Sequence, residues 1–198
     1  REVSSASHGH DLEDAEAIRL ASTGDHRAFG VLIGRYKHMV YTVASRVMRN
    51  SMDAEEVTQD VFVKAFQKLN EFQGVGKFST WLYSIAYRMS ISALRARKDQ
   101  GSSLDDMKTS GVEPREDPLH PVDDRKQILE QALTTLEPDD AALVTMFYLE
   151  ELSVEEIVTV TQLSASNVKV KLHRSRKKLY DELHHQLKDE LWTLRTTA

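Results

Sequence analysis

Apolar residues recur every three or four positions through most of this chain, and this spacing constrains its fold more than any other feature. In an α-helix such residues share one face, which packs inward. The clearest example is the segment 26–49, with apolar residues at Phe29, Leu32, Tyr36, Val40, Val43 and Val47. No segment stands out with the apolar–polar alternation of a half-buried strand. The sequence therefore predicts an all-α protein.

Residues that start and stop helices divide the chain into two small helical domains. We expect the first domain to span 12–98, with helices at 12–22 and 26–49, one from Asp53, and one from Ser79 or Thr80. We expect the second to span 125–198, with helices at 125–136, 138–150, 154–161 and from about Ser164 towards Leu194.

Two short patterns predict where helices begin. Asp53 is followed three residues later by Glu56, and Ser153 is followed in the same way by Glu156. In such a capping box each side chain accepts a hydrogen bond from the backbone of the other residue. Pro138 is a third signal, because proline is favoured in the first turn of a helix.

Two segments show no helical periodicity. Residues 99–124 are acidic and contain three of the four Pro and two of the eight Gly, so we expect a flexible linker between the domains. Residues 1–11 are rich in Ser and His, and we expect a disordered tail there.

Composition excludes several classes of function. The chain has no Cys, which rules out disulfides and thiolate metal sites and fits a reducing, cytoplasmic location. No run approaches the roughly 18 apolar residues of a membrane span, so we expect no membrane insertion. The histidines at 8, 10, 184 and 185 form no convincing ligand set, and no nucleophile–base or phosphate-loop motif occurs. We therefore expect no enzyme, cofactor or metal.

Charge is distributed in blocks. The formal net charge is -5, yet residues 167–179 hold six Lys or Arg and no carboxylate. Residues 72–98 hold five cations and no Asp or Glu, and acidic stretches separate the two basic segments. This alternation predicts two contact surfaces for a polyanion.

The basic segment 167–179 is predicted to form a DNA-binding helix. On a helical wheel Val168, Leu172, Ser175 and Leu179 form one narrow inner stripe, and the cations occupy the remaining faces. A short helix and a tight turn precede it, which together predict a helix-turn-helix. The candidate contacts are Ser166, Asn167, Lys169, Val170, Lys171, His173, Arg174, Arg176 and Lys177. The competing interpretation is a charged face that is merely solvated.

The basic segment 72–98 contains both aromatic and cationic residues. Tyr83 and Tyr87 share one outer side of the predicted helix, with Arg88 and Arg95 further round. Exposed rings can stack on unpaired bases while cations follow the phosphates. Alternatively the aromatic residues belong to the bundle core, which the spacing favours for Trp81 and leaves open for the two tyrosines.

The helix that starts at Asp53 has an unusual outer face. An apolar residue stands there among carboxylates and amides, which indicates a protein-docking surface, although a single exposed Val is also normal. The residues of this face are Glu56, Gln59, Asp60, Val63 and Gln67.

Four motifs together resemble bacterial sigma factors of the extracytoplasmic-function (ECF) group, over roughly 26–98 and 125–185. The motifs are D-A-E-E-V-T-Q-D-V-F-V-K-A-F (53–66), F-S-T-W-L-Y-S-I-A (78–86), L-S-V-E-E-I (152–157) and S-N-V-K-V-K-L-H-R-S-R-K-K-L (166–179). The resemblance implies two helical domains on a flexible linker, without catalysis. It also implies that the protein binds core RNA polymerase and promoter DNA, often under the control of an anti-sigma partner.

The resemblance also implies residue roles. The outer face of the Asp53 helix resembles the polymerase-docking element, and the basic helix resembles the reader of the -35 element. The segment that resembles the -10 element and single-strand contact comprises Lys77, Phe78, Ser79, Thr80, Tyr83, Tyr87, Arg88 and Arg95.

The sequence departs from the family pattern at three places. Tyr87-Arg88 replaces the usual Arg-Asn, and Ser92 replaces a common Asp, which puts the -10 contacts in question. Gln162 replaces the usual small residue in the last turn, where we expect a negative φ to suffice.

Two alternative functions remain open at the level of sequence. A polymerase-independent helix-turn-helix regulator would form dimers and bind a palindromic site. A helical adaptor would bind proteins only, with both basic faces solvated.

Overall fold

The computed structural model describes the backbone of residues 5–99 and 124–196, and the side chains of residues 14–99 and 127–186. Within these ranges the chain is helical and contains no strand, which confirms the all-α prediction. Most of the expected linker, residues 100–123, lies outside the described residues.

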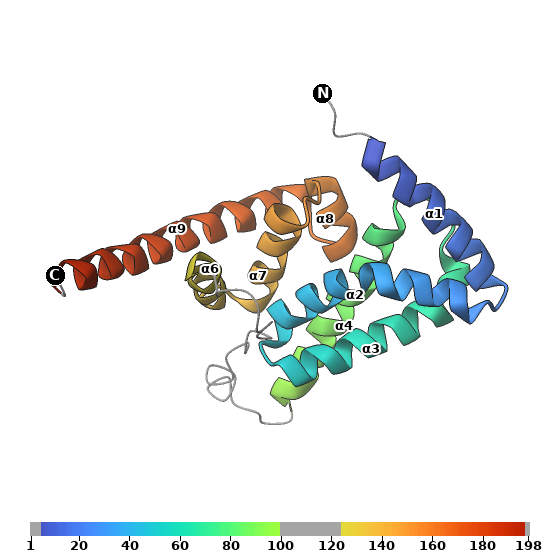
Figure 1. Cartoon of the computed structure of the whole chain (residues 1–198), viewed down its shortest axis with the longest axis horizontal. Helices are drawn as coiled ribbons and strands as arrows, with labels where there is room; N and C mark the ends of the chain where they lie inside the picture. The colour runs from blue at the N-terminus through green and yellow to red at the C-terminus, as the bar shows by residue number, and fades with distance from the viewer. Residues whose placement is uncertain (1–4, 100–123, 197–198) are drawn as a thin grey trace.

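The N-terminal domain is a bundle built around one central helix, α2 (Figure 1). Its elements are α1 (Ser5–Ser22), α2 (His26–Met48), α3 (Ser51–Gln67), the 3-10 turn η1 (Leu69–Glu71) and α4 (Phe78–Asp99). The predicted apolar stripe of α2 is buried except for Tyr36, which is half-buried. Helix α1 begins at Ser5, so residues 5–11 are helical where we expected a disordered tail.

The starts of α3 and α4 differ from the predicted positions, whereas α2 begins at His26 as predicted. Asn50, rather than Asp53, caps α3, since its side chain accepts a hydrogen bond of 3.0 Å from the backbone N–H of Asp53. Helix α4 begins at Phe78, before both of the capping residues that we expected. One of them, Thr80, is buried in the helix and bonds to the C-terminal domain instead.

The C-terminal domain consists of short helices followed by one long helix that projects away from the rest of the molecule (Figure 1). Its elements are α6 (Asp124–Thr134), α7 (Pro138–Val144), the π-helical turn η2 (Thr145–Leu149), α8 (Val154–Thr161) and α9 (Ala165–Thr196). Pro138 opens α7 as predicted. The predicted capping box of α8 is also present, with Ser153 and Glu156 bonding each other's backbone N–H at 3.1 and 2.9 Å.

The turn between α8 and α9 contradicts one expectation. Gln162 adopts a left-handed conformation with φ 63°, not the negative φ that we expected. Left-handed backbone is unfavourable for most residues other than Gly and Asn. Here the Gln162 side chain donates a hydrogen bond of 2.7 Å to the carbonyl of Thr159, and its backbone N–H closes α8 on Val158.

The two domains pack against each other. Helix α4 lies against α8, and α2 lies against α7, so the buried residues of both domains form one continuous apolar cluster. Charged groups line the edge of this interface, as when Arg49 donates to the carbonyl of Leu136. The described domains therefore form a closed arrangement.

We predict that Val61→Ala in α3 lowers the free energy of unfolding by about 2 kcal/mol, because it removes two methyl groups from a close-packed site. Val63→Ala is the matched control: Val61 is 0% exposed, whereas Val63 is 57% exposed two residues further along the same helix. Urea unfolding of both variants measures the difference. Equal losses would show that the burial assignment of α3 is wrong.

Candidate polymerase and nucleic-acid interfaces

A helix-turn-helix is formed by α8 and α9. Ile157 and Val160 of α8 are buried, and so is the predicted inner stripe of α9: Val168, Leu172, Ser175 and Leu179. At the start of α9, Ser164 accepts a hydrogen bond of 3.2 Å from the backbone of Asn167 through its side chain. The second helix is thus anchored along the inner stripe that the wheel predicted, and it also packs against α6 and α7.

The outer face of α9 exposes nearly all of the predicted DNA contacts. The exposed members are Ser166, Asn167, Lys169, Val170, His173, Arg174, Arg176 and Lys177. Val170 is 43% exposed in the middle of this cationic surface, where an apolar side chain can contact a thymine methyl group. The residues therefore form a surface that a DNA groove can reach.

Lys171 is the exception on this helix. Its ammonium group contacts the carboxylates of Asp139, at 2.9 Å, and Asp140, and its side chain is one-quarter exposed. Burial acts to lower the pKa of Lys171, but hydrogen bonds to Asp140 and Asp139 outweigh it and raise this pKa. Lys171 thus ties α9 to the start of α7 and is less exposed than the other predicted DNA contacts.

The outer face of α3 is open. All five predicted docking residues, Glu56, Gln59, Asp60, Val63 and Gln67, are exposed. Met52, which the sequence reading missed, is 78% exposed and lies three turns before Val63, about 20° away around the helix. Extending the predicted face one turn towards the start of the helix would have found it. The face therefore presents two apolar side chains among carboxylates and amides.

The predicted single-strand platform on α4 is not exposed. Tyr83 is 2% exposed and Tyr87 is 9% exposed, which contradicts the expectation that both lie on the outer side. Phe78 and Thr80 are also buried, Ser79 is half-buried, and only Lys77, Arg88 and Arg95 are exposed. Trp81 is half-buried in a cluster of rings with Phe72 and Phe78, at centroid distances of 5.4 to 5.5 Å.

The C-terminal domain covers this side of α4. Burial raises the pKa of Tyr83, and the nearby Glu150 carboxylate raises it further. At the start of α4, one oxygen of Glu156 lies 3.2 Å from the ammonium group of Lys77 and accepts a hydrogen bond of 3.2 Å from Thr80. Carboxylates of one domain thus meet the predicted DNA contacts of the other.

Two absences bear on the kind of site. Across the residues that the structure describes, no group of three or more acidic or histidine side chains is placed to hold a metal ion. In the same residues no helix combines the length and the apolar character needed to cross a membrane.

Known proteins share both domains. Residues 32–100 match Sigma-70 region 2, and residues 126–179 match Sigma-70, region 4. The ECF RNA polymerase sigma factor SigW of Bacillus subtilis (strain 168) is 28% identical over 178 residues, covering 84% of this chain and 94% of SigW. The ECF RNA polymerase sigma-E factor of Escherichia coli (strain K12) is 29% identical over 175 residues, covering 83% and 91%.

A solved structure shares the fold. The sigma factor RpoE from Bartonella quintana, crystallised with the anti-sigma factor NepR, superposes with a TM-score of 0.68 at 20% identity, covering 79% of this chain and 96% of RpoE. With the two matched regions, the chain belongs to the sigma-70 family, which directs promoter-specific transcription and is not a family of enzymes. Within this family it is an ECF sigma factor, as the sequence motifs indicated.

We predict that Lys171→Ala lowers the free energy of unfolding by about 1 kcal/mol, because it leaves two partly buried carboxylates without their partner. Lys169→Ala, two residues earlier and exposed, should change it by less than about 0.5 kcal/mol. Urea unfolding of both variants measures the difference. If both variants lose the same stability, the anchoring role of Lys171 is wrong.

Proposed function

We propose that this sigma factor divides its work among three surfaces. The α3 face docks on core RNA polymerase, α9 reads the -35 element in the major groove, and the start of α4 with its preceding loop contacts the unpaired -10 strand. The protein would act in the cytoplasm, where polymerase and promoters are. The observation that carries this proposal is the cationic face of α9 over residues 167–179, which contains no acidic residue and exposes every predicted DNA contact in it except Lys171.

Electrostatics and geometry support the role of α9. Its cations give affinity for phosphates, and Asn167 and Lys169 near the helix start are of the types that pair with adenine and guanine. The first helix of such a motif crosses the DNA backbone while the second enters the groove. Lys171 contributes indirectly, by fixing α9 on α7.

The α3 face is suited to a protein partner. Val63 and Met52 supply apolar contact area, and the carboxylates around them give a charge pattern that a basic polymerase surface can complement. In Figure 1, α3 and α9 lie on opposite sides of the molecule, so one surface can engage polymerase while the other faces DNA.

We also propose that a protein partner controls this factor. The relative from Bartonella quintana was solved in complex with the anti-sigma factor NepR. Affinity capture from the native host, with the full chain as bait, should recover a specific protein that blocks transcription when it is added back. Recovery of core polymerase alone would argue against such a partner.

The function is tested by transcription from genomic fragments with purified core polymerase, with and without this protein. We expect new start sites that require it. Val63→Glu should abolish them and remove the protein from immobilised core enzyme, because a charge is placed in the apolar contact.

Val170→Glu is the matched control, because it places the same charge on the proposed DNA-binding face of α9 instead of on α3. It should retain core binding and lose the promoter-specific transcripts. A chain that binds a palindromic duplex tightly without polymerase, and yields no new transcripts, would instead be the polymerase-independent regulator.

Two substitutions on α9 should separate base reading from phosphate binding. Asn167→Ala should relax base preference at one position of the -35 element, at a cost of about 1–3 kcal/mol for the preferred base. Lys177→Ala should weaken binding to all sequences alike and reduce the salt slope by about 1. Competition binding of polymerase holoenzyme to a -35 duplex library measures both. Identical effects of the two variants would contradict this division.

A further inference from the structure

We propose that Lys171 and Lys178 are positioning residues for base recognition. They clasp α9 to the α6–α7 elbow, residues 135–140, and so fix the angle at which the helix presents its base-reading side chains. This inference rests on the proposed role of α9 at the -35 element. It goes further, because it assigns part of the base preference to residues that do not touch DNA.

The first observation is that the two lysines hold opposite ends of the elbow. The Lys171 ammonium group contacts the carboxylates of Asp139, at 2.9 Å, and Asp140, where α7 begins. The Lys178 ammonium group donates to the carbonyl of Thr135, just after α6 ends. The two lysines are separated by two helical turns, about 10.5 Å along the axis of α9. Two contacts at this separation oppose both rotation and tilting of the helix.

The second observation is that the clasp lies on a different side of α9 from the neighbouring DNA candidate. At about 100° per residue Lys171 and Lys178 are about 20° apart around the helix, whereas Lys177 is about 100° or more from both. The Lys171 side chain is 25% exposed and meets two carboxylates, and Lys178 is bonded to the elbow although it is exposed. Both ammonium groups are thus engaged within the C-terminal domain, so we expect neither to contact a phosphate.

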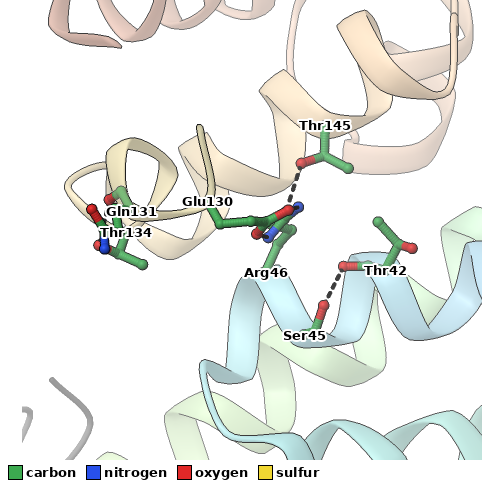
Figure 2. Close-up of polar contacts among 7 residues, drawn as sticks. All are labelled: Thr42, Ser45, Arg46, Glu130, Gln131, Thr134 and Thr145. Carbon is green, nitrogen blue, oxygen red and sulfur yellow. Dashed lines mark hydrogen bonds and ion pairs between the residues drawn. The ribbon is translucent and has the colours of Figure 1, made fainter. Parts of the chain in front are cut away.

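The third observation is that the elbow is itself held in place. Thr134 donates a side-chain hydrogen bond of 2.6 Å to the carbonyl of Gln131 in α6 (Figure 2), and Thr135 makes the equivalent bond, of 2.8 Å, one residue further on. Leu136 is buried, and so is Pro138, whose ring restricts the backbone at the start of α7. The clasp therefore fastens α9 to a fixed point of the domain.

Base contacts depend on the angle of a helix more than phosphate contacts do. A helix is about 10–12 Å across with its side chains, so a rotation of about 20° moves a side chain at its edge by about 2 Å. A hydrogen bond to a base edge does not survive such a shift, whereas a long, flexible Lys side chain can follow a phosphate across it. Loss of the clasp should therefore lower discrimination between bases and leave the sequence-independent affinity in place.

The test measures base preference and salt dependence together, in competition binding of the holoenzyme, formed from purified core polymerase and the full-length protein, to a -35 duplex library. Lys171→Ala combined with Lys178→Ala should lower the ratio of preferred to mismatched binding by about ten-fold, as for loss of one bidentate base contact, without changing the salt slope. Lys177→Ala is the control at an adjacent exposed lysine. It should reduce the salt slope by about 1 without changing the ratio.

The clasp can also be broken from the elbow, outside α9. Asp139→Asn combined with Asp140→Asn should relax the base preference as well, and adding Lys171→Ala to this pair should cause no further loss, because all three residues make one contact. Lys171→Arg should retain the preference, since a guanidinium group also pairs with carboxylates. A purely structural role would instead reduce the active fraction of protein, which lowers binding to all sequences alike.

Two results would overturn the clasp. The first is an unchanged base preference in both the double lysine and the double aspartate variants. The second is a preference relaxed by Lys171→Ala but not by the aspartate changes, which would make Lys171 a base-reading residue. Asn167→Ala distinguishes these failures from failure of the proposed function. If it relaxes the preference and the clasp variants do not, only the clasp is rejected, whereas a natural chain with no -35 preference rejects the proposed function itself.

Discussion

Both domains depend on the packing of α2. This helix contacts α1, α3 and α4 within its own domain, and α7 and η2 across the interface. Its residues Val40, Val43 and Val47 are fully buried, so it contributes to the apolar cluster that runs through both domains. Charged contacts lie around the edge of this packing, such as the pair of Arg46 with Glu130 (Figure 2).

Local signals predicted much of the fold, because amphipathic periodicity and capping depend on residues close in sequence. The capping box at Ser153 and the inner stripe of α9 are both of this kind. The predicted start of α3 was wrong because Asn and Asp are equally good N-cap residues. The neighbouring sequence therefore does not show whether Asn50 or Asp53 caps the helix. The left-handed Gln162 could not be predicted either, because its strain is offset by its own side-chain hydrogen bond to Thr159.

For the candidate site, the helical wheel was reliable where the buried residues of a helix share one side, as on α3 and α9. It separated Val61 from Val63 on α3, and Val168 from Val170 on α9. It failed on α4, because a helix packed between two domains buries two faces, and the second face cannot be told from a solvent-exposed one by spacing alone. Tyr83 and Tyr87 lie on that second face. The pairing of Lys171 with Asp139 was likewise hidden, since they are far apart in sequence.

The carboxylate of Glu156 divides its two oxygens between two tasks. Oε2 accepts from the Ser153 backbone within the capping box, and Oε1 faces Lys77 and Thr80 of the other domain. Rotation of the domains apart would therefore release one oxygen to water while the other keeps the first turn of α8 intact. The capping box of α8 and the contact with α4 are therefore made by different oxygens, so the start of the helix-turn-helix does not rely on the other domain for its cap.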